Sequence, residues 1–520
     1  MISKADPTVG ELTMEDRMPA DHRYWTAAAA LTGIAVASAL ALADQSRVTP
    51  AAPASGRNIV VFVADDHGQD AGAYGHTVVR TPHLDALAAE GVLFKHAYAT
   101  TASCSASRSV ILSGLHNHRT GQYGHEHDYS HFRSYDDLKT LPVLLREAGY
   151  RTARSGKFHV APEATYKFET VLEGPQRSPV EMAEHARAFI AARDPRPFFL
   201  YVATSDPHRG GGIAHELPSH PDRFGNRPEG YPGIDPVTYD PAAVVVPPWL
   251  PDSAASRAEL AQYYQSVSRL DQGFGHLVQV LKDEGVYDQS LIVYLSDHGA
   301  AFPGAKTTVY EPGLRSPLIV RLPNGQRRGI SSEGLVSWVD ITPTLLDFAG
   351  ATPPTYKQHI GSPEVRATAD LPETHGLHGR SFLGLARGED VAGWDEVYAS
   401  HTFHEIQMYY PMRAVRGRRF KLIWNIAHQL PFPFSTDLWS AATWQSAWLG
   451  KGSVKYGLRT VAGYINRPEF ELYDLQHDPH EARNLARDRQ FAEVLAEHKK
   501  KIRDFQARTS DPWILKWEYQ

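Results

Sequence analysis

The side chains of this chain that could do chemistry gather in short polar segments, and each segment follows an apolar run. The acidic segments hold Asp65 and Asp66, after residues 58–64, and Asp297 with His298, after residues 290–295. Three carboxylates that converge without partners repel one another, so their convergence would indicate a divalent cation. The competing interpretation is structural, because an Asp-Asp pair after a strand often belongs to a loop or a helix cap.

Cys104 is the only cysteine in 520 residues, so the chain has no internal disulfide. Small polar residues before it and an apolar run with helical spacing after it predict that Cys104 lies at a helix N-terminus. Backbone N–H groups there favour an anion or a thiolate, and Arg108, one turn later, would lie on the same face. A lone cysteine is usually an inert buried residue, so a chemical role for Cys104 depends on its neighbours.

Two further polar segments would supply positive groups and proton carriers for an anion. Lys157 and His159 follow an apolar run at residues 149–153, and His208 follows one at residues 198–202. Lys306 comes shortly after the second acidic segment. Each residue alone is more simply a solvated lysine or a structural histidine, and only their joint placement after predicted strands favours a site.

The apolar runs are short and continuous, which is typical of strands that are buried on both faces. Helical patterns lie between them, for example at residues 138–148 and 259–284. Alternating strands and helices predict an open α/β sheet. Ligands of such sheets collect beyond the carboxyl ends of the strands, so we expect the polar segments to converge there.

A second, smaller domain is predicted toward the C-terminus. Residues 210–257 look like a long irregular excursion, and the Pro/Gly/His-rich stretch at 352–395 is a plausible domain boundary. Beyond it, strand-like runs at 413–416, 420–424 and 471–475 precede a charged helical pattern at 490–508. We therefore predict a main domain at residues 58–390 and an antiparallel α+β subdomain at residues 391–520.

The N-terminal region resembles an export signal. Residues 26–43 form an uncharged run after Arg17 and Arg23, and Ala41-Leu42-Ala43 fits a cleavage site. We predict a signal at residues 1–43 and a linker at 44–57, with a retained membrane anchor as the alternative. The chain has no Asn-x-Ser/Thr site, which favours the bacterial periplasm or exterior over a eukaryotic secretory compartment. Its net charge of −6 gives no global basic field for nucleic acid.

The segment Cys104-Ser105-Ala106-Ser107-Arg108 resembles the sulfatase signature Cys-x-Pro-x-Arg, whose cysteine is oxidised after translation to formylglycine. The two acidic segments and Gly156-Lys157-x-His159 extend the resemblance, which runs from about Asn58 almost to the C-terminus. Within the family the chain is most similar to the sulfamidases, or heparan N-sulfatases, for example at residues 206–209, 410–413 and 477–481. The resemblance implies an alkaline phosphatase-like fold: a large mixed, mostly parallel sheet flanked by helices, with a smaller C-terminal domain on an antiparallel sheet.

The resemblance also implies a role for each candidate residue. One divalent cation, expected to be Ca²⁺, would be bound by Asp65, Asp66, Asp297, His298 and the formylglycine made from Cys104. Arg108 would orient the hydrated aldehyde, Lys157 and Lys306 would neutralise sulfuryl oxygens, His159 would contact the diol and His208 would protonate the departing amine. The sugar would be contacted from the second domain by His404, Glu405 and Arg413.

Three departures from the family pattern bear on these roles. Ala106 replaces the signature proline, which puts oxidation of Cys104 in question. His298 stands where many sulfatases have Asn, and imidazole also suits transition metals. Lys306 stands where the sulfamidase pattern has Arg, which keeps the charge but loses the bidentate fork.

The implied function is hydrolysis of the N-sulfate of N-sulfoglucosamine at the non-reducing end of heparin or heparan fragments. The implied partners are sulfated glucosamine saccharides and a formylglycine-generating or sulfatase-maturing enzyme, with a homodimer as one option. The alternatives are an O-sulfatase, a phosphonate or phosphoester hydrolase of the same superfamily, and a silent sugar-binding homologue with unmodified Cys104. A zinc site at His125, His127 and His131 is a further option, but without a HExxH motif a substrate-lining or surface role is favoured.

Overall fold

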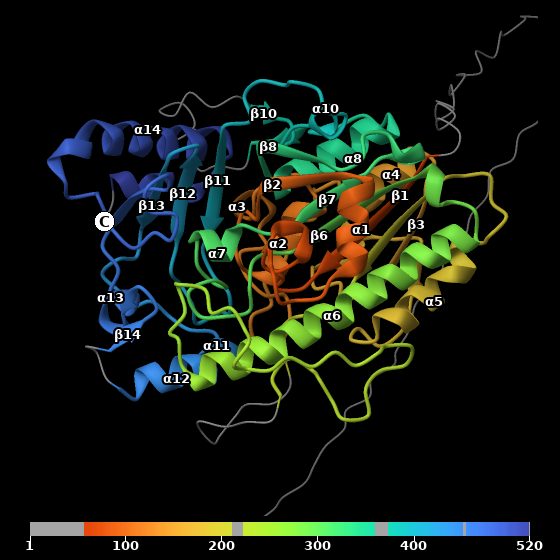
Figure 1. Cartoon of the computed structure of the whole chain (residues 1–520). Coiled ribbons are helices and arrows are strands. Elements are labelled where there is room, and N and C mark those ends of the chain that lie inside the picture. Colours follow the sequence, from red (N-terminus) through yellow and green to blue (C-terminus); the bar gives the residue numbers. More distant parts are fainter. Residues whose placement is uncertain (1–56, 211–221, 359–372, 451–453, 519–520) are drawn as a thin grey trace, which may run out of the picture. The chain divides into compact units, whose positions relative to one another are not determined.

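The computed structural model describes residues 57–210, 222–358, 373–450 and 454–518 (Figure 1). The predicted export signal and the predicted linker up to residue 56 lie outside the described residues. Among the helices that the structure describes, none has both the length and the apolar character needed to cross a bilayer.

The centre of the fold is an eight-stranded sheet with the order β4-β3-β5-β1-β6-β7-β2-β8. Its strands are β1 (Asn58–Ala64), β2 (Val92–Tyr98), β3 (Arg151–Gly156), β4 (Thr170–Leu172), β5 (Phe198–Ala203), β6 (Ser290–Ser296), β7 (Leu318–Arg321) and β8 (Ile330–Ser337). Only the pairings of β7 with β6 and with β2 are antiparallel. The expected large mixed, mostly parallel sheet is confirmed.

Helices cover both faces of this sheet (Figure 1). One face carries α2 (Cys104–Ile111), α4 (Leu141–Glu147) and α8 (Ile341–Ala349), and the other carries α1 (Pro82–Glu90), α5 (Pro179–Ile190) and α6 (Ala254–Asp283). Alternate residues of β1 enter the two cores: Ile59, Val61 and Val63 face one, and Val60 and Phe62 face the other. Burial on both faces explains why the strand is apolar throughout rather than alternating.

The C-terminal part forms an antiparallel sheet with the order β11-β12-β13-β16. Its strands are β11 (Glu396–His401), β12 (Met412–Gly417), β13 (Phe420–Asn425) and β16 (Phe470–Asp474), and α14 (Ala492–Arg508) packs against them. The expected second α+β unit is therefore confirmed, while its boundary at residue 390 stays a prediction. Met412, Ile423 and Tyr473 of this sheet share a core with Tyr263 of α6 and Phe302, which ties the two sheets together.

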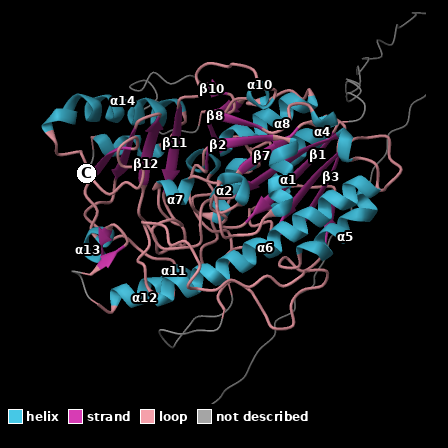
Figure 2. Cartoon of the chain, in the orientation of Figure 1, coloured by secondary structure: helices cyan, strands magenta, loops and turns pink. Residues whose placement is uncertain are grey.

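The remaining described elements are short. The strand pairs are β9 (Tyr356–Lys357) with β10 (Thr374–His375), and β14 (Lys455–Tyr456) with β15 (Arg459–Thr460). The short helices are α3 (Asn117–Thr120), α7 (Glu311–Leu314), α10 (Leu383–Ala386), α11 (Thr436–Trp439), α12 (Ala442–Trp448) and α13 (Val461–Ile465). Of the irregular excursion predicted at residues 210–257, residues 222–253 contain neither helix nor extended strand, but α6 begins at Ala254, inside the predicted range. Figure 2 shows loops gathered between the central strands and the second sheet.

The strand order places the predicted polar segments next to one another. In the sheet, β3, β5, β1 and β6 are consecutive neighbours and parallel, so their carboxyl ends share one edge. Main-chain hydrogen bonds continue past these ends: Asp65 N donates to Asp206 O and Asp297 N donates to Ala64 O, both at 3.0 Å. The backbone therefore fixes the polar segments where the sequence predicts that a ligand would bind.

Candidate active site

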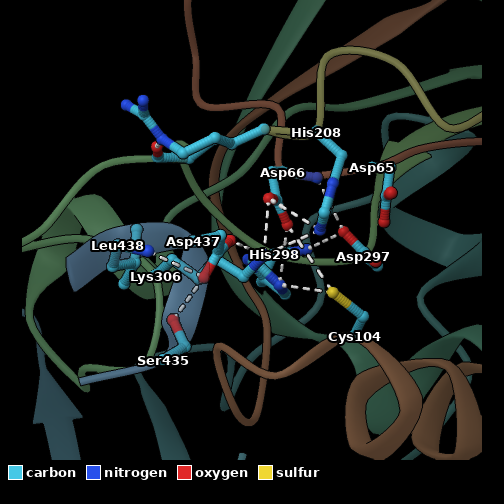
Figure 3. Close-up of polar contacts among 12 residues, drawn as sticks. Asp65, Asp66, Cys104, His208, Asp297, His298, Lys306, Ser435, Asp437 and Leu438 are labelled. Carbon is cyan, nitrogen blue, oxygen red and sulfur yellow. Dashed lines mark hydrogen bonds and ion pairs between the residues drawn. The ribbon is translucent and has the colours of Figure 1, made fainter. Parts of the chain in front are cut away.

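Four of the five predicted metal ligands form one buried group at this edge (Figure 3). Ligand atoms of Asp66, Cys104, Asp297 and His298 all lie within 4.8 Å of one another, and all four residues are buried. Cys104 Sγ lies 3.4 Å from His298 Nε2 and 3.7 Å from Asp66 Oδ1. Asp66 has a left-handed φ of 64°, and its N–H donates to Asp297 Oδ1 at 3.0 Å, so a strained turn after β1 joins the two acidic segments.

Asp65, the fifth predicted ligand, is engaged differently. Its Oδ1 accepts a hydrogen bond from Arg108 Nη2 at 3.0 Å, and its Oδ2 lies 2.6 Å from Lys157 Nζ. Burial alone would raise the pKa of this carboxyl, but the Lys157 and Arg108 cations hold it well below its usual range. Asp65 is thus an ionised carboxylate whose two oxygens are already paired with cations.

Charge balance in the group fits a divalent cation. Burial raises the pKa of Asp66 to about 7 although Lys306 lowers it in part, and burial also raises the pKa of Asp297 against the effect of Arg108. Burial would lower the pKa of His298, but Asp297 and Asp66 raise it to about 10. The neighbouring cationic side chains therefore do not fully compensate the negative charges of Asp66 and Asp297. A metal ion bound here would supply the missing positive charge and would replace the proton of the His298 imidazole. Carboxylate oxygens suit calcium, whereas the imidazole also suits softer metals.

Arg108 connects the ends of three strands. Its Nε donates to Asp297 Oδ2 at 3.1 Å, its Nη2 donates to Asp65, and its Nη1 donates to Lys157 O at 3.0 Å. The side chain is completely buried, so these bonds are not weakened by solvent. In the structure Arg108 therefore pairs with Asp65 and Asp297, and its expected role of orienting the hydrated aldehyde stays a prediction.

The predicted helix N-terminus at Cys104 is confirmed. Cys104 is the first residue of α2, all of whose residues are buried, and Ser103 occupies the N-cap position with extended backbone but without a side-chain capping bond. Ser107 Oγ and Trp338 Nε1 both donate to Asp297 O, the latter at 2.8 Å. These bonds fix α2 against the end of β6 and hold Cys104 beside the acidic group.

Lys306 lies between the acidic group and the C-terminal part of the chain (Figure 3). Its Nζ is 2.9 Å from Asp66 Oδ2, from Asp437 Oδ2 and from His208 Nε2. Asp437, in α11, was not predicted from the sequence, because an isolated acid far from the strand-end segments carries no local pattern. Lys306 is fully buried, and the two carboxylates overcome its desolvation and raise its pKa well above the ordinary value. It is therefore a permanently charged group next to His208.

A pocket of about 1130 Å³ opens onto this group. Its lining includes the predicted residues Asp65, Lys157, His159, His208, Lys306, His404 and Glu405, together with Asp437 and a histidine pair, His125 and His127. Completely buried Cys104 and Asp66 lie next to it, since Lys306 contacts Asp66 directly. His404 Nδ1 is 3.0 Å from Ser103 Oγ, so the pocket wall from the second sheet also touches the N-cap residue of α2.

Arg413 is the one predicted site residue that the structure places elsewhere. It is fully buried in β12, its Nη2 donates to Asp511 Oδ1 at 2.8 Å, and its Nη1 donates to His401 O at 2.9 Å. It does not line the pocket formed by the described residues. The predicted sugar contact is therefore replaced by a structural role, because the guanidinium pairs with a buried carboxylate.

We expect Arg413→Met to lower the free energy of unfolding by about 3–5 kcal/mol, because it leaves the Asp511 carboxylate buried without its cation. Urea unfolding monitored by fluorescence measures the loss. Arg418→Met is the matched control, since Arg418 pairs with Asp395 at the surface and such pairs contribute about 1 kcal/mol or less. Equal effects of the two substitutions would contradict the structural role of Arg413.

Comparison with known proteins agrees with this geometry. A family model described as Sulfatase matches residues 57–351, and one described as N-sulphoglucosamine sulphohydrolase, C-terminal, matches residues 302–430. The chain is 38% identical to human N-sulphoglucosamine sulphohydrolase over 88% of its own length and 91% of the relative's. It is 28% identical to an ulvan-active sulfatase of Formosa agariphila, covering 84% of this chain and 77% of that protein.

A solved structure shares the fold. It is described as a complex with its substrate D-glucosamine-2-N,6-O-disulfate, and it aligns with a TM-score of 0.60 at 21% identity, over 87% of this chain and 98% of the other. Matched by a family model over more than half of its length, and by a relative over most of both chains, the chain belongs to the sulfatase family.

Proposed function

We propose that this sulfatase hydrolyses the N-sulfate of N-sulfoglucosamine at the non-reducing end of heparin or heparan fragments. The observation that carries the proposal is the buried group around Cys104, next to Lys157 and Lys306, in a chain that aligns with nine-tenths of the human sulphohydrolase. The match to the C-terminal model of that enzyme supports the same substrate class, because the matched residues 302–430 contribute His404 and Glu405 to the pocket.

Two groups would complete the site. Formylglycine, made from Cys104 by a maturing enzyme, supplies a hydrated aldehyde as the nucleophile, and a divalent cation, with Ca²⁺ expected, supplies positive charge beside it. Asp66, Asp297, His298 and residue 104 would hold the ion, with Asp65 as the fifth candidate. The donor set and the raised pKa values of Asp66 and Asp297 support this assignment.

The protein's own residues would bind and polarise the sulfuryl group. Lys157 and Lys306 both line the pocket and carry charge in a buried setting, where they stabilise negative oxygens most strongly as charge develops. The N-terminus of α2 adds partial positive charge at residue 104. Arg108 would keep Asp65 and Asp297 in place, so the site needs little reorganisation during the reaction.

His208 is the candidate acid for the departing amine. Burial, followed by the Lys306 and Lys157 cations, lowers its pKa well below the ordinary value, so the imidazole is neutral while the pocket is empty. Its Nε2 accepts a hydrogen bond from Lys306 Nζ. An anionic sulfamate bound among these cations would offset their charge and raise the pKa of His208, so protonation would accompany substrate binding.

We expect His208→Ala to slow hydrolysis of N-sulfoglucosamine by about 10²–10⁴-fold and hydrolysis of an aryl sulfate by much less. An amine leaves poorly without a proton, whereas a phenolate leaves almost unaided. Matched kcat/KM values on the two substrates measure the difference. Lys157→Ala is the control, because loss of a sulfate-binding charge should slow both reactions alike, and equal losses in His208→Ala would remove the general-acid assignment.

The same assays separate the alternatives. A higher rate on aryl sulfate or on a phosphonate monoester than on N-sulfoglucosamine would favour an O-sulfatase or a phosphonate hydrolase. Peptide mass mapping across residues 101–108 would identify a silent homologue, in which Cys104 is unmodified.

Export to a bacterial periplasm or exterior is also proposed, on the sequence of residues 26–43 alone.

A further inference from the structure

A histidine cluster lies on the pocket wall, apart from the acidic group. Ligand nitrogens of His125, His127 and His159 all lie within 4.8 Å of one another, and the three ring centroids are 4.6–4.9 Å apart. His159 Nε2 and His127 Nδ1 are hydrogen-bonded at 2.6 Å. The cluster joins a loop that follows α3 to the segment that follows β3, so only the tertiary structure assembles it.

The cluster contains nitrogens without partners. His125 is 7% exposed, and its Nε2 is buried without a hydrogen bond, as is His159 Nδ1. A buried polar atom without a partner is costly in the folded state, so it points to a missing ligand. Burial lowers the pKa of all three imidazoles, that of His125 to about 3, so they are neutral at physiological pH and each has one nitrogen lone pair that could bind a metal ion.

We propose that His125, His127 and His159 form a second metal site, for a transition metal ion of the Zn²⁺ class. Neutral imidazoles are ligands of zinc, cobalt, nickel and copper, whereas calcium requires oxygen ligands, so this all-histidine site would not hold the calcium expected in the acidic group. Three protein ligands would leave a fourth position of a tetrahedral ion open to the pocket.

The geometry requires a small adjustment. Nitrogens that share a tetrahedral zinc ion at about 2.0–2.1 Å lie roughly 3.3 Å apart, so an ion held by His127 Nδ1 and His159 Nε2 would require these two atoms to separate from their hydrogen-bonded distance of 2.6 Å. His404 packs against His125 with ring centroids 3.9 Å apart and is itself bonded to Ser103. The His404 ring would therefore limit how far the His125 ring can move during this adjustment.

Occupancy would inhibit the enzyme, a consequence that rests on the proposed function. His159 lines the same pocket as Lys157 and His208, and an ion bound to it would place positive charge and bulk where the saccharide must enter. The ion would also fix the imidazole that is expected to contact the reacting group. The protein would then lose turnover when zinc-class ions rise, while the buried acidic group keeps its own ion.

Equilibrium dialysis of the calcium-loaded protein against Zn²⁺ tests the site itself. We expect one Zn²⁺ per chain beyond the calcium, with affinity about 100-fold weaker or more in His125→Ala and in His127→Ala. His131→Ala is the matched control, since His131 is an exposed histidine on the same pocket wall and outside the cluster. Asp297→Asn should retain Zn²⁺, because it alters only the acidic group.

The outcomes separate the two sites and the two proposals. Absence of the additional Zn²⁺, equal losses in His127→Ala and His131→Ala, or loss of Zn²⁺ in Asp297→Asn would each overturn the histidine site. A visible absorption band of tetrahedral Co²⁺ that disappears in His127→Ala would support the site. The His127 side chain is 44% exposed, so its loss should leave folding intact, and this variant keeps the test valid if His125→Ala fails to fold. Zinc inhibition of the wild type but not of His127→Ala would support the regulatory consequence, and binding without inhibition would refute it. A chain that binds Zn²⁺ in this way but releases no sulfate would refute only the proposed function.

Discussion

Cys104→Ser should reduce turnover of N-sulfoglucosamine to the background rate, at least about 10⁴-fold below the wild type. Serine keeps the size of the side chain at the start of α2 but cannot be matured to the aldehyde, and a sulfated serine has no second hydroxyl with which to expel sulfate. Cys104→Ala should be equally inactive. Sulfate release under multiple-turnover conditions, measured beside the wild type, checks the prediction.

Folding must be shown to survive these substitutions. Cys104 is buried, and its closest polar neighbours are His298 and Asp66, so a one-atom change should alter the thermal midpoint only slightly. Peptide mapping of residues 101–108 should show the modified residue in the wild type alone. Retained multiple turnover in either variant would refute the mechanism, and unmodified Cys104 in fully active protein would refute the role of formylglycine.

Asp297→Asn should lower kcat/KM by about 10²–10³-fold or more and should reduce the bound divalent ion. The substitution removes the negative charge that faces Arg108 and places an amide group at one of the two oxygen positions. Chelation of the wild-type enzyme should cause a similar loss, and added Ca²⁺ should restore the wild type but not the variant. Elemental analysis of the active protein, together with rates before and after chelation, measures both effects.

Asp271→Asn controls for the replacement of a buried acid. Asp271 is also completely buried, but it accepts hydrogen bonds from the N–H groups of His83 and Leu84 at the start of α1. This variant should lose stability while keeping its ion and its kcat. Full activity of metal-free wild type would refute the metal site, and zinc or manganese in place of calcium would make His298 the determining ligand.

The sequence alone determined the central sheet and most of the buried site. Residues 58–64 and 290–295 are apolar without alternation because helices cover both faces of the sheet, and that pattern is readable locally. Parallel strands bring their carboxyl ends to one edge, so the strand pattern is enough to place Asp65, Asp66 and Asp297 together. The helix N-terminus at Cys104 was equally predictable, because the polar residues before it and the helical spacing of apolar residues after it are local in the sequence.

The tertiary structure decided which of these groups pair. Asp65 and Asp66 are adjacent in the sequence, yet Asp65 pairs with Arg108 and Lys157 while Asp66 joins Cys104 and His298, since successive residues at a strand end point in different directions. Asp437 pairs with Lys306, and Arg413 pairs with Asp511 rather than lying in the pocket to contact a sugar, because the packing of the second sheet sets both distances. His159 joins His125 and His127 where the spacing had suggested His131. Contacts between segments far apart in the sequence leave no local pattern, so only the folded chain could determine these partners.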